Sequence, residues 1–311
     1  MEKEKAGEAR PPQTPPSLVD GAPRKRGVWG GRASPAFSFA ERIRVTDDDP
    51  DRWYSTNSVG VPSWLLASPL FNARAPALTL HGTRETHPGL FRVLDEAGSQ
   101  EEAAEIFDHY MTVQFGPIFE GQNGPSWRRT YLDLLRGWGV DSSSPHGAVL
   151  KGWVESRFGL VPTYHKETLG GFPSEAWAVY FEEKASRCYH ASGINFQLDL
   201  LYEYAQWCLR RFAHPGPRRV TLWRGSNDCE QQLLEGTLRD PWCVLRLNNV
   251  ISFTSSRERA DEFGDWVLEV DIPTCKLLYF PGLIREPVFN SEREYLVLGG
   301  AYLVAARRSL Y

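Results

Sequence analysis

The periodicity of hydrophobic residues changes once along this 311-residue chain, close to Pro217, and this change limits the folds that the chain can adopt. Before it, from about Ser99 to His214, apolar residues recur at the spacing of α-helices. After it, short runs rich in β-branched and aromatic residues alternate with glycines and prolines, as in antiparallel strands. The chain is therefore predicted to be α+β, with a mostly helical N-terminal half and a β-sandwich core in the C-terminal half.

The segment before the change carries the start and stop signals of several helices. Ser99 and Glu102 form a capping box at the start of SQEEAAEIFDHYMTVQF. A second helix is predicted to begin at Ser126 and to be interrupted by Gly137 and Gly139. Further helices are predicted over residues 146–158, 174–190 and 194–214, with a stop at Pro215.

The segment after the change is predicted to form short antiparallel strands. Gly299 and Gly300 are expected to join the last two in a two-residue hairpin turn. One short helix is expected over residues 256–263, directly after a strand. The predicted strands cover residues 219–224, 249–254, 266–272, 276–280, 294–298 and 301–306.

The same patterns suggest how the chain is divided. Residues 1–35 are rich in proline, glycine and charge without apolar periodicity, which predicts a flexible tail. A mostly helical region is expected over residues 36–215 and a β-rich core over residues 216–311. The pattern leaves open whether these are two domains or one integrated domain over residues 36–311.

Charge and composition argue against several classes of protein. A net charge of −4 and a pI near 6.0 give no general attraction to nucleic acid. The longest uncharged stretch, residues 53–73, contains prolines and asparagines, so no membrane span is expected. The N-terminus lacks the apolar centre of a secretory signal. Five cysteines without a CxxC pair favour a reducing compartment, and a cytoplasmic location is predicted.

The common enzyme motifs are also absent. The sequence has no GxxxxGK[ST] phosphate loop, no GxGxxG coupled to a strand, no HExxH and no GxSxG. Its histidines and cysteines do not occur at zinc-ligand spacing, so no metal site is expected.

Three short motifs in the C-terminal half point to chemistry when they are taken together. They are Trp-Arg-Gly at 223–225, Phe-Thr-Ser-Ser at 253–256 and Glu-Arg-Glu at 292–294. Each alone is typical of ordinary structure, namely a surface arginine, a helix N-cap and solvated edge carboxylates. The alternation of strand residues places Glu292 and Glu294 on one face, where two like charges need a compensating cation.

In this order the motifs resemble the Arg–Ser–Glu signature of the arginine-modifying ADP-ribosyltransferases. The stretches 53–57, 71–72 and 81–85 are similar to those of bacterial NAD(+)–dinitrogen-reductase ADP-D-ribosyltransferases. The resemblance covers nearly the whole chain after the tail. One departure is Arg257, which stands where arginine-specific members often have a further polar residue.

The resemblance implies an enzyme that transfers ADP-ribose from NAD+ to an arginine side chain and releases nicotinamide. Glu294 is expected to stabilise the positive charge that develops on the ribose. Glu292 is expected to orient the acceptor guanidinium and to take its proton. The residues expected to bind NAD+ are Arg224, Gly225, Ser255 and Phe263.

The resemblance also implies partners. The protein substrate would be dinitrogenase reductase, the iron protein of nitrogenase, and a PII-type nitrogen signalling protein would be a regulatory partner. Two other hypotheses stay open: an arginine ADP-ribosyltransferase with a different protein target, and a non-catalytic module that binds NAD+ or a PII protein. The non-catalytic hypothesis predicts that replacing Glu294 leaves function intact, whereas both catalytic hypotheses predict loss.

Overall fold

The computed structural model describes most of the chain after residue 56. The described residues are 57–116, 130–190, 193–213, 219–227, 229–286, 288–289 and 293–309. They all belong to one compact unit, Pro35–Tyr311. The tail predicted for residues 1–35 lies outside them, and so does the predicted domain boundary near residue 215. No helix among the described residues is both long and apolar enough to cross a lipid bilayer.

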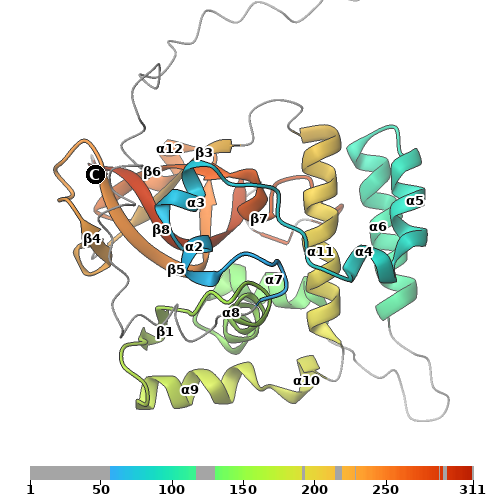
Figure 1. Ribbon diagram of the computed structural model, residues 1–311, viewed down its shortest axis with the longest axis horizontal. Coiled ribbons are helices and arrows are strands. Elements are labelled where there is room, and N and C mark those ends of the chain that lie inside the picture. The colour runs from blue at the N-terminus through green and yellow to red at the C-terminus, as the bar shows by residue number, and fades with distance from the viewer. Residues whose placement is uncertain are drawn as a thin grey trace, which may run out of the picture. The chain divides into compact units, whose positions relative to one another are not determined.

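The described part of the N-terminal half is helical, as its periodicity predicts (Figure 1). Between α8 and α9 lies a small hairpin of two strands, β1 (Tyr164–His165) and β2 (Glu167–Thr168). A π-helical turn, η2 (Leu209–Ala213), follows the last helix. The helices are α2 (Ser63–Leu66), α3 (Pro69–Ala73), α4 (Thr83–Thr86), α5 (Pro88–Glu96), α6 (Gln100–Phe115), α7 (Tyr131–Val140), α8 (Pro145–Phe158), α9 (Glu175–Lys184), α10 (Arg187–His190) and α11 (Ile194–Cys208).

Side-chain caps determine where α6 and α7 begin. Ser99 caps α6 as predicted, because its Oγ accepts from the backbone N–H of Glu102 at 3.1 Å. The reciprocal half of the predicted capping box differs, since the carboxylate of Glu102 accepts from the N–H of Gly98 at 2.8 Å. The predicted start at Ser126 lies outside the described residues, and α7 is capped instead by Thr130 with Asp133. These two residues form a reciprocal capping box, in which each backbone N–H donates to the other side chain.

The prediction that Gly137 and Gly139 interrupt α7 is wrong, because the helix continues through both to Val140. A Cβ at position 137 would lie 2.2 Å from the ring of His146 on α8, and one at position 139 would lie 2.9 Å from Phe289. The two glycines therefore allow close packing of α7 against its neighbours rather than ending the helix.

An antiparallel sheet forms the C-terminal half and confirms the α+β prediction. The strand order is β4-β5-β3-β6-β8-β7, and a further pairing of β5 with β8 closes β5, β3, β6 and β8 into a ring. A short helix, α12 (Arg257–Asp261), follows β5. The strands are β3 (Arg219–Ser226), β4 (Leu233–Glu235), β5 (Cys243–Thr254), β6 (Trp266–Pro273), β7 (Leu277–Tyr279) and β8 (Glu294–Arg308), with 3-10 turns η3 (Cys229–Gln232) and η4 (Thr274–Lys276).

The hairpin turn predicted at Gly299 and Gly300 is wrong, because β8 is one continuous strand through both. A Cβ at Gly299 would lie 1.6 Å from the carbonyl oxygen of Asn248, and Gly300 has a φ of +112°. The next residue, Ala301, donates its N–H to the carbonyl of Ala67 at 2.7 Å. The glycine pair thus marks an irregular pairing and a close approach of α2, not a reversal of the chain.

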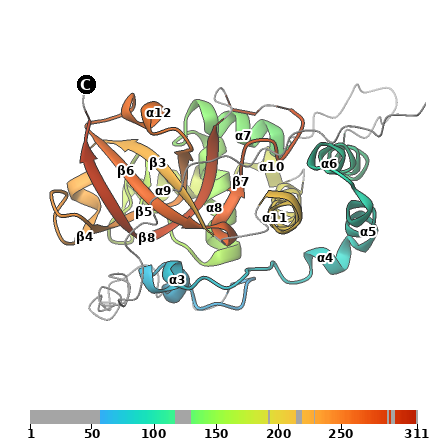
Figure 2. The same ribbon diagram turned by 90° about the horizontal axis from the view of Figure 1, so that it is seen from above.

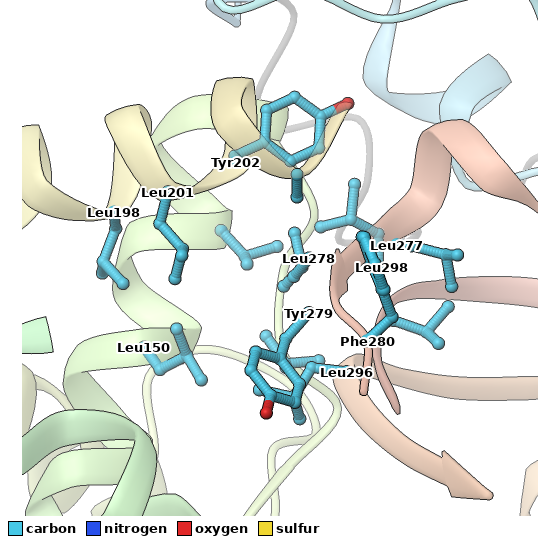
Figure 3. Close-up of a cluster of buried hydrophobic side chains, with 14 of the residues drawn as sticks. Leu150, Leu198, Leu201, Tyr202, Leu277, Leu278, Tyr279, Phe280, Leu296 and Leu298 are labelled. Atoms are coloured by element: carbon cyan, nitrogen blue, oxygen red, sulfur yellow. The ribbon is translucent and has the colours of Figure 1, made fainter. Parts of the chain in front are cut away.

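One hydrophobic core joins the helices to the sheet. In Figures 1 and 2, α11 lies between the sheet on one side and α5 and α6 on the other. The hydroxyl of Tyr202 on α11 donates to the carbonyl of Cys275 at 2.8 Å, which ties the helix to the segment before β7. In Figure 3, side chains of α11 face those of β7 and β8, among them Leu198, Leu201, Leu278, Leu296 and Leu298.

Replacing Gly137 with alanine is expected to lower the free energy of unfolding by about 1–3 kcal/mol, the usual cost of overpacking. In an unconstrained helix the same change raises stability by about 1 kcal/mol, so the sign of the effect tests the contact with His146. Urea denaturation measures it. Gly89→Ala on α5 is the matched control, because a Cβ there meets nothing within 4 Å. Unchanged or higher stability of Gly137→Ala would contradict the packing described.

Candidate active site

The strands β3 and β5 diverge, and this divergence opens the sheet. In the described chain they pair at Trp223 and Thr254, whereas β3 pairs with β6 from Arg219 to Ser226. A cavity of about 560 Å³ lies at the opening, and a second cavity of about 470 Å³ adjoins it. We call the two together the cleft. The residues that line both cavities are Arg224, Gly225, Ser252 and Phe263.

Arg224 lies near the end of β3 and bridges the diverging strands. Its Nη1 donates to the carbonyl oxygen of Ser252 on β5 at 2.9 Å. Burial lowers the pKa of Arg224, while the neighbouring Cys229 and Glu294 raise it. A guanidinium stays protonated even after a considerable decrease, so the cleft contains a fixed positive charge.

Glu294, the first residue of β8, lines the second cavity. Its Oε1 accepts a hydrogen bond from the Oγ of Ser252 at 2.7 Å, and that Oγ accepts one from the indole Nε1 of Trp138 on α7 at 3.0 Å. Glu294 stands opposite Thr254 in the β5–β8 register. Ser252, two residues earlier, shares the face of Thr254 and therefore reaches the carboxylate.

The environment of Glu294 disfavours its charge. Burial raises the pKa of the Glu294 carboxyl, and the hydrogen bond from Ser252 and the charge of Arg224 offset this only in part. A carboxylate that is partly removed from water and held by a cation and a hydroxyl is typical of catalytic acids and bases.

A second group of residues closes the cleft from the side of α12. A Cβ at Gly225 would lie 2.1 Å from the carbonyl oxygen of Ala260, so a glycine is needed for α12 to pack against β3. Phe263, just after this helix, is 59% exposed at the edge of both cavities. The guanidinium of Arg259 lies 4.9 Å from its ring centroid, and Arg259 lines the second cavity.

The structure separates the two serines of the predicted motif. Ser255 is exposed, and its contact with NAD+ stays a prediction, whereas it is the Oγ of Ser252 that donates to Glu294. Ser256 caps α12, because its Oγ accepts from the N–H of Arg259 at 3.2 Å. The sequence does not predict this role of Ser252, because the role depends on the register between β5 and β8. The available signal is the two-residue spacing of Ser252 and Thr254, which places both on one face of a strand.

Glu292 lies outside the described residues, so its place beside Glu294 stays a prediction. The other stretches that carry the resemblance support the fold rather than line the cleft. Asn72 donates to the carbonyl of Ala301 at 2.9 Å, and Arg84 forms an ion pair with the buried Glu203. Residues 53–56 also lie outside the described part of the chain.

The chemistry open to this cleft follows from its charges. A carboxylate at the wall of a cavity stabilises positive charge that develops on a bound sugar, and an arginine binds phosphates through its fork of donors. No group of three His, Cys, Asp or Glu side chains arranged to hold a metal occurs among the described residues. The cleft is thus suited to a ligand that carries an anionic group and develops positive charge as it reacts.

Comparison with known proteins agrees with this chemistry. The model of the dinitrogenase reductase ADP-ribosyltransferase family matches residues 56–306. A protein from Rhodospirillum rubrum named NAD(+)–dinitrogen-reductase ADP-D-ribosyltransferase is 46% identical over 269 residues, which is 84% of this chain and 97% of that protein. No solved structure matches the chain significantly.

Replacing Glu294 with glutamine is expected to stabilise the fold at pH 7. Because burial raises the folded-state pKa of Glu294, its contribution to stability is fully present below the unfolded value of about 4.3 and is lost as pH rises through the folded pKa. Glutamine does not ionise, so the difference from the native chain should shrink toward pH 4. Thermal unfolding across this pH range measures it, with the exposed Glu175→Gln on α9 as control. A difference that does not change with pH would contradict the expectation.

Proposed function

The chain belongs to the dinitrogenase reductase ADP-ribosyltransferase family, and on this premise we propose that it transfers ADP-ribose from NAD+ to an arginine of dinitrogenase reductase. Nicotinamide is the second product, so the enzyme is a glycosyltransferase with NAD+ as co-substrate. The observation that carries the proposal is the meeting of Arg224 and Glu294, from two separate strands, at one cleft beside Ser252.

The bond that breaks joins C1′ of the ribose to the pyridinium nitrogen of nicotinamide. Nicotinamide leaves with the bonding electron pair, and positive charge develops on the sugar as in glycoside hydrolysis. We assign Glu294 to accept a hydrogen bond from the ribose 2′-OH and to stabilise this charge. The hydroxyl of Ser252 keeps the carboxylate in place while the charge develops.

NAD+ is proposed to lie along the cleft. Arg224 suits the pyrophosphate, because its guanidinium presents paired donors to phosphate oxygens. The backbone of Gly225, which lines both cavities, is proposed to hold the nicotinamide amide, and the exposed ring of Phe263 offers a surface for the nicotinamide to stack on. For Ser255, contact with the ribose rests on the family resemblance alone.

The acceptor is proposed to need a second carboxylate. A guanidinium is protonated at neutral pH and is therefore a poor nucleophile. We assign Glu292 to orient the acceptor arginine and to take its proton as the new bond to C1′ forms. The support is the Glu-Arg-Glu motif at 292–294, whose last residue, Glu294, is the first residue of β8.

The proposed product explains a regulatory effect. ADP-ribose adds bulk and replaces a positive site on dinitrogenase reductase with two phosphates, which hinders docking of its electron-accepting partner and switches nitrogen fixation off. We also propose a PII-type signalling protein as a partner and the cytoplasm as the location. The PII partner is supported by the family resemblance, and the location by five cysteines without a CxxC pair, which favour a reducing compartment.

Mass spectrometry of dinitrogenase reductase after incubation with the purified chain and NAD+ tests the reaction. One ADP-ribose is expected on an arginine, and Glu294→Gln should lower the rate about 100- to 1000-fold, the usual effect of removing one transition-state contact. Glu175→Gln serves as the matched control and should retain activity. An unmodified dinitrogenase reductase would refute the proposed substrate, and an active Glu294→Gln would refute the assigned role.

Replacing Glu292 with glutamine should separate the two halves of the reaction. Transfer to arginine is expected to fall about 100-fold or more, since the acceptor loses its base. Release of nicotinamide in the absence of protein substrate should largely persist, because Glu294 still stabilises the ribose. Parallel assays of nicotinamide release and arginine modification measure this, and equal losses in both assays would remove Glu292 from the acceptor role.

A further inference from the structure

Trp138 connects the helical half of the chain to the acid of the cleft. It lies on α7, is 4% exposed, and lines the first cavity. Its Nε1 lies 3.0 Å from the Oγ of Ser252, which in turn lies 2.7 Å from the Oε1 of Glu294. Three residues from α7, β5 and β8 thus form a continuous chain of hydrogen bonds that ends at the proposed catalytic carboxylate.

The chemistry of the indole determines which group donates and which accepts in these two hydrogen bonds. An indole N–H donates and cannot accept, so the oxygen of Ser252 must be the acceptor of the bond from Trp138. The one hydroxyl proton of Ser252 is then left for the carboxylate of Glu294. Without the indole, a serine hydroxyl on a strand is free to rotate toward a nearby backbone carbonyl.

The packing of α7 holds the indole in place. The ammonium of the buried Lys151 on α8 lies 5.9 Å from the ring centroid of Trp138 and donates to the carbonyl of Tyr164 at 2.9 Å. The residue immediately before Trp138, Gly137, lets α7 approach His146 on α8. The donor is therefore fixed by helix packing before any ligand binds, which is the condition for a preorganised site.

We propose that Trp138 is a positioning residue, which fixes the Ser252 hydroxyl so that its proton points to Glu294 and holds that carboxylate ready for the developing charge. This inference rests on the proposed function for its kinetic consequence. The hydrogen-bond chain itself does not depend on what the substrate is.

Trp138→Phe tests the proposal, because it keeps an aromatic ring and removes the donor. The kcat for ADP-ribosylation is expected to fall about five- to tenfold, the effect of one hydrogen bond, while the KM for NAD+ changes by less than about twofold. Trp207→Phe is the matched control, since this buried indole donates to Asp95 at 2.7 Å, away from the cleft. Equal losses in both variants would overturn the proposal.

A pH profile and a double-mutant cycle separate positioning from general stability. A misdirected Ser252 hydroxyl lowers the pKa of Glu294 less, so the acidic limb of the kcat profile should move to higher pH in Trp138→Phe. The other groups that face Glu294 are Arg224, Tyr279 and, along the cavity wall, Arg259. In a Ser252→Ala background, Trp138→Phe should not lower kcat further. Additive losses of kcat would contradict the coupling of Trp138 to Glu294 through Ser252.

An NMR measurement on the unmodified chain tests the inference without activity and without a variant at position 138. The indole N–H resonance of Trp138 is expected to titrate with the pKa of Glu294 and to stop doing so in Glu294→Gln. A resonance that does not respond to Glu294 refutes the inference. If the native chain modifies no dinitrogenase reductase while this titration is observed, the proposed function fails and the positioning of Glu294 stands.

Discussion

The site depends on one partly buried carboxylate, Glu294, and on the groups that compensate its charge. Removing Glu294 from water raises its pKa, and a buried charge without partners destabilises a fold. The partners come from different elements: Arg224 from β3 and the hydroxyl of Ser252 from β5. Arg224, Ser252 and Glu294 are far apart in sequence, so they meet only when their strands pair in the closed ring.

The sequence was informative wherever the signal is local. The cap at Ser99 and the start of β8 at Glu294 follow from neighbouring residues, whereas β3 continues two residues beyond its predicted end at Arg224. The structure brings Arg224 and Glu294 together. The glycine pair at 299–300 misled because a hairpin turn and a close approach of two backbones favour the same residue. The hydrogen bond of Ser252 could not be predicted without the register between β5 and β8.

The helices contribute more to the cleft than the division of the sequence into two halves suggests. Gly139 of α7 lines the second cavity, and Trp138 beside it reaches Ser252. The hydrogen bond between Trp138 and Ser252 joins residues that are far apart in sequence, so no periodicity or motif predicts it. The same helix packs closely against α8 at Gly137.

The length of β8 has a consequence for work with this protein. Its first residue is Glu294, it pairs with β5 as far as Val304, and its last five residues, Val304–Arg308, pair with β6. Proteolytic trimming or a bulky fusion at Val304–Arg308 would therefore break the pairing of β8 with β6. The other neighbour of β6 is β3, the strand that contains Arg224. An affinity tag placed there would thus disturb Arg224 and the cleft from a distance.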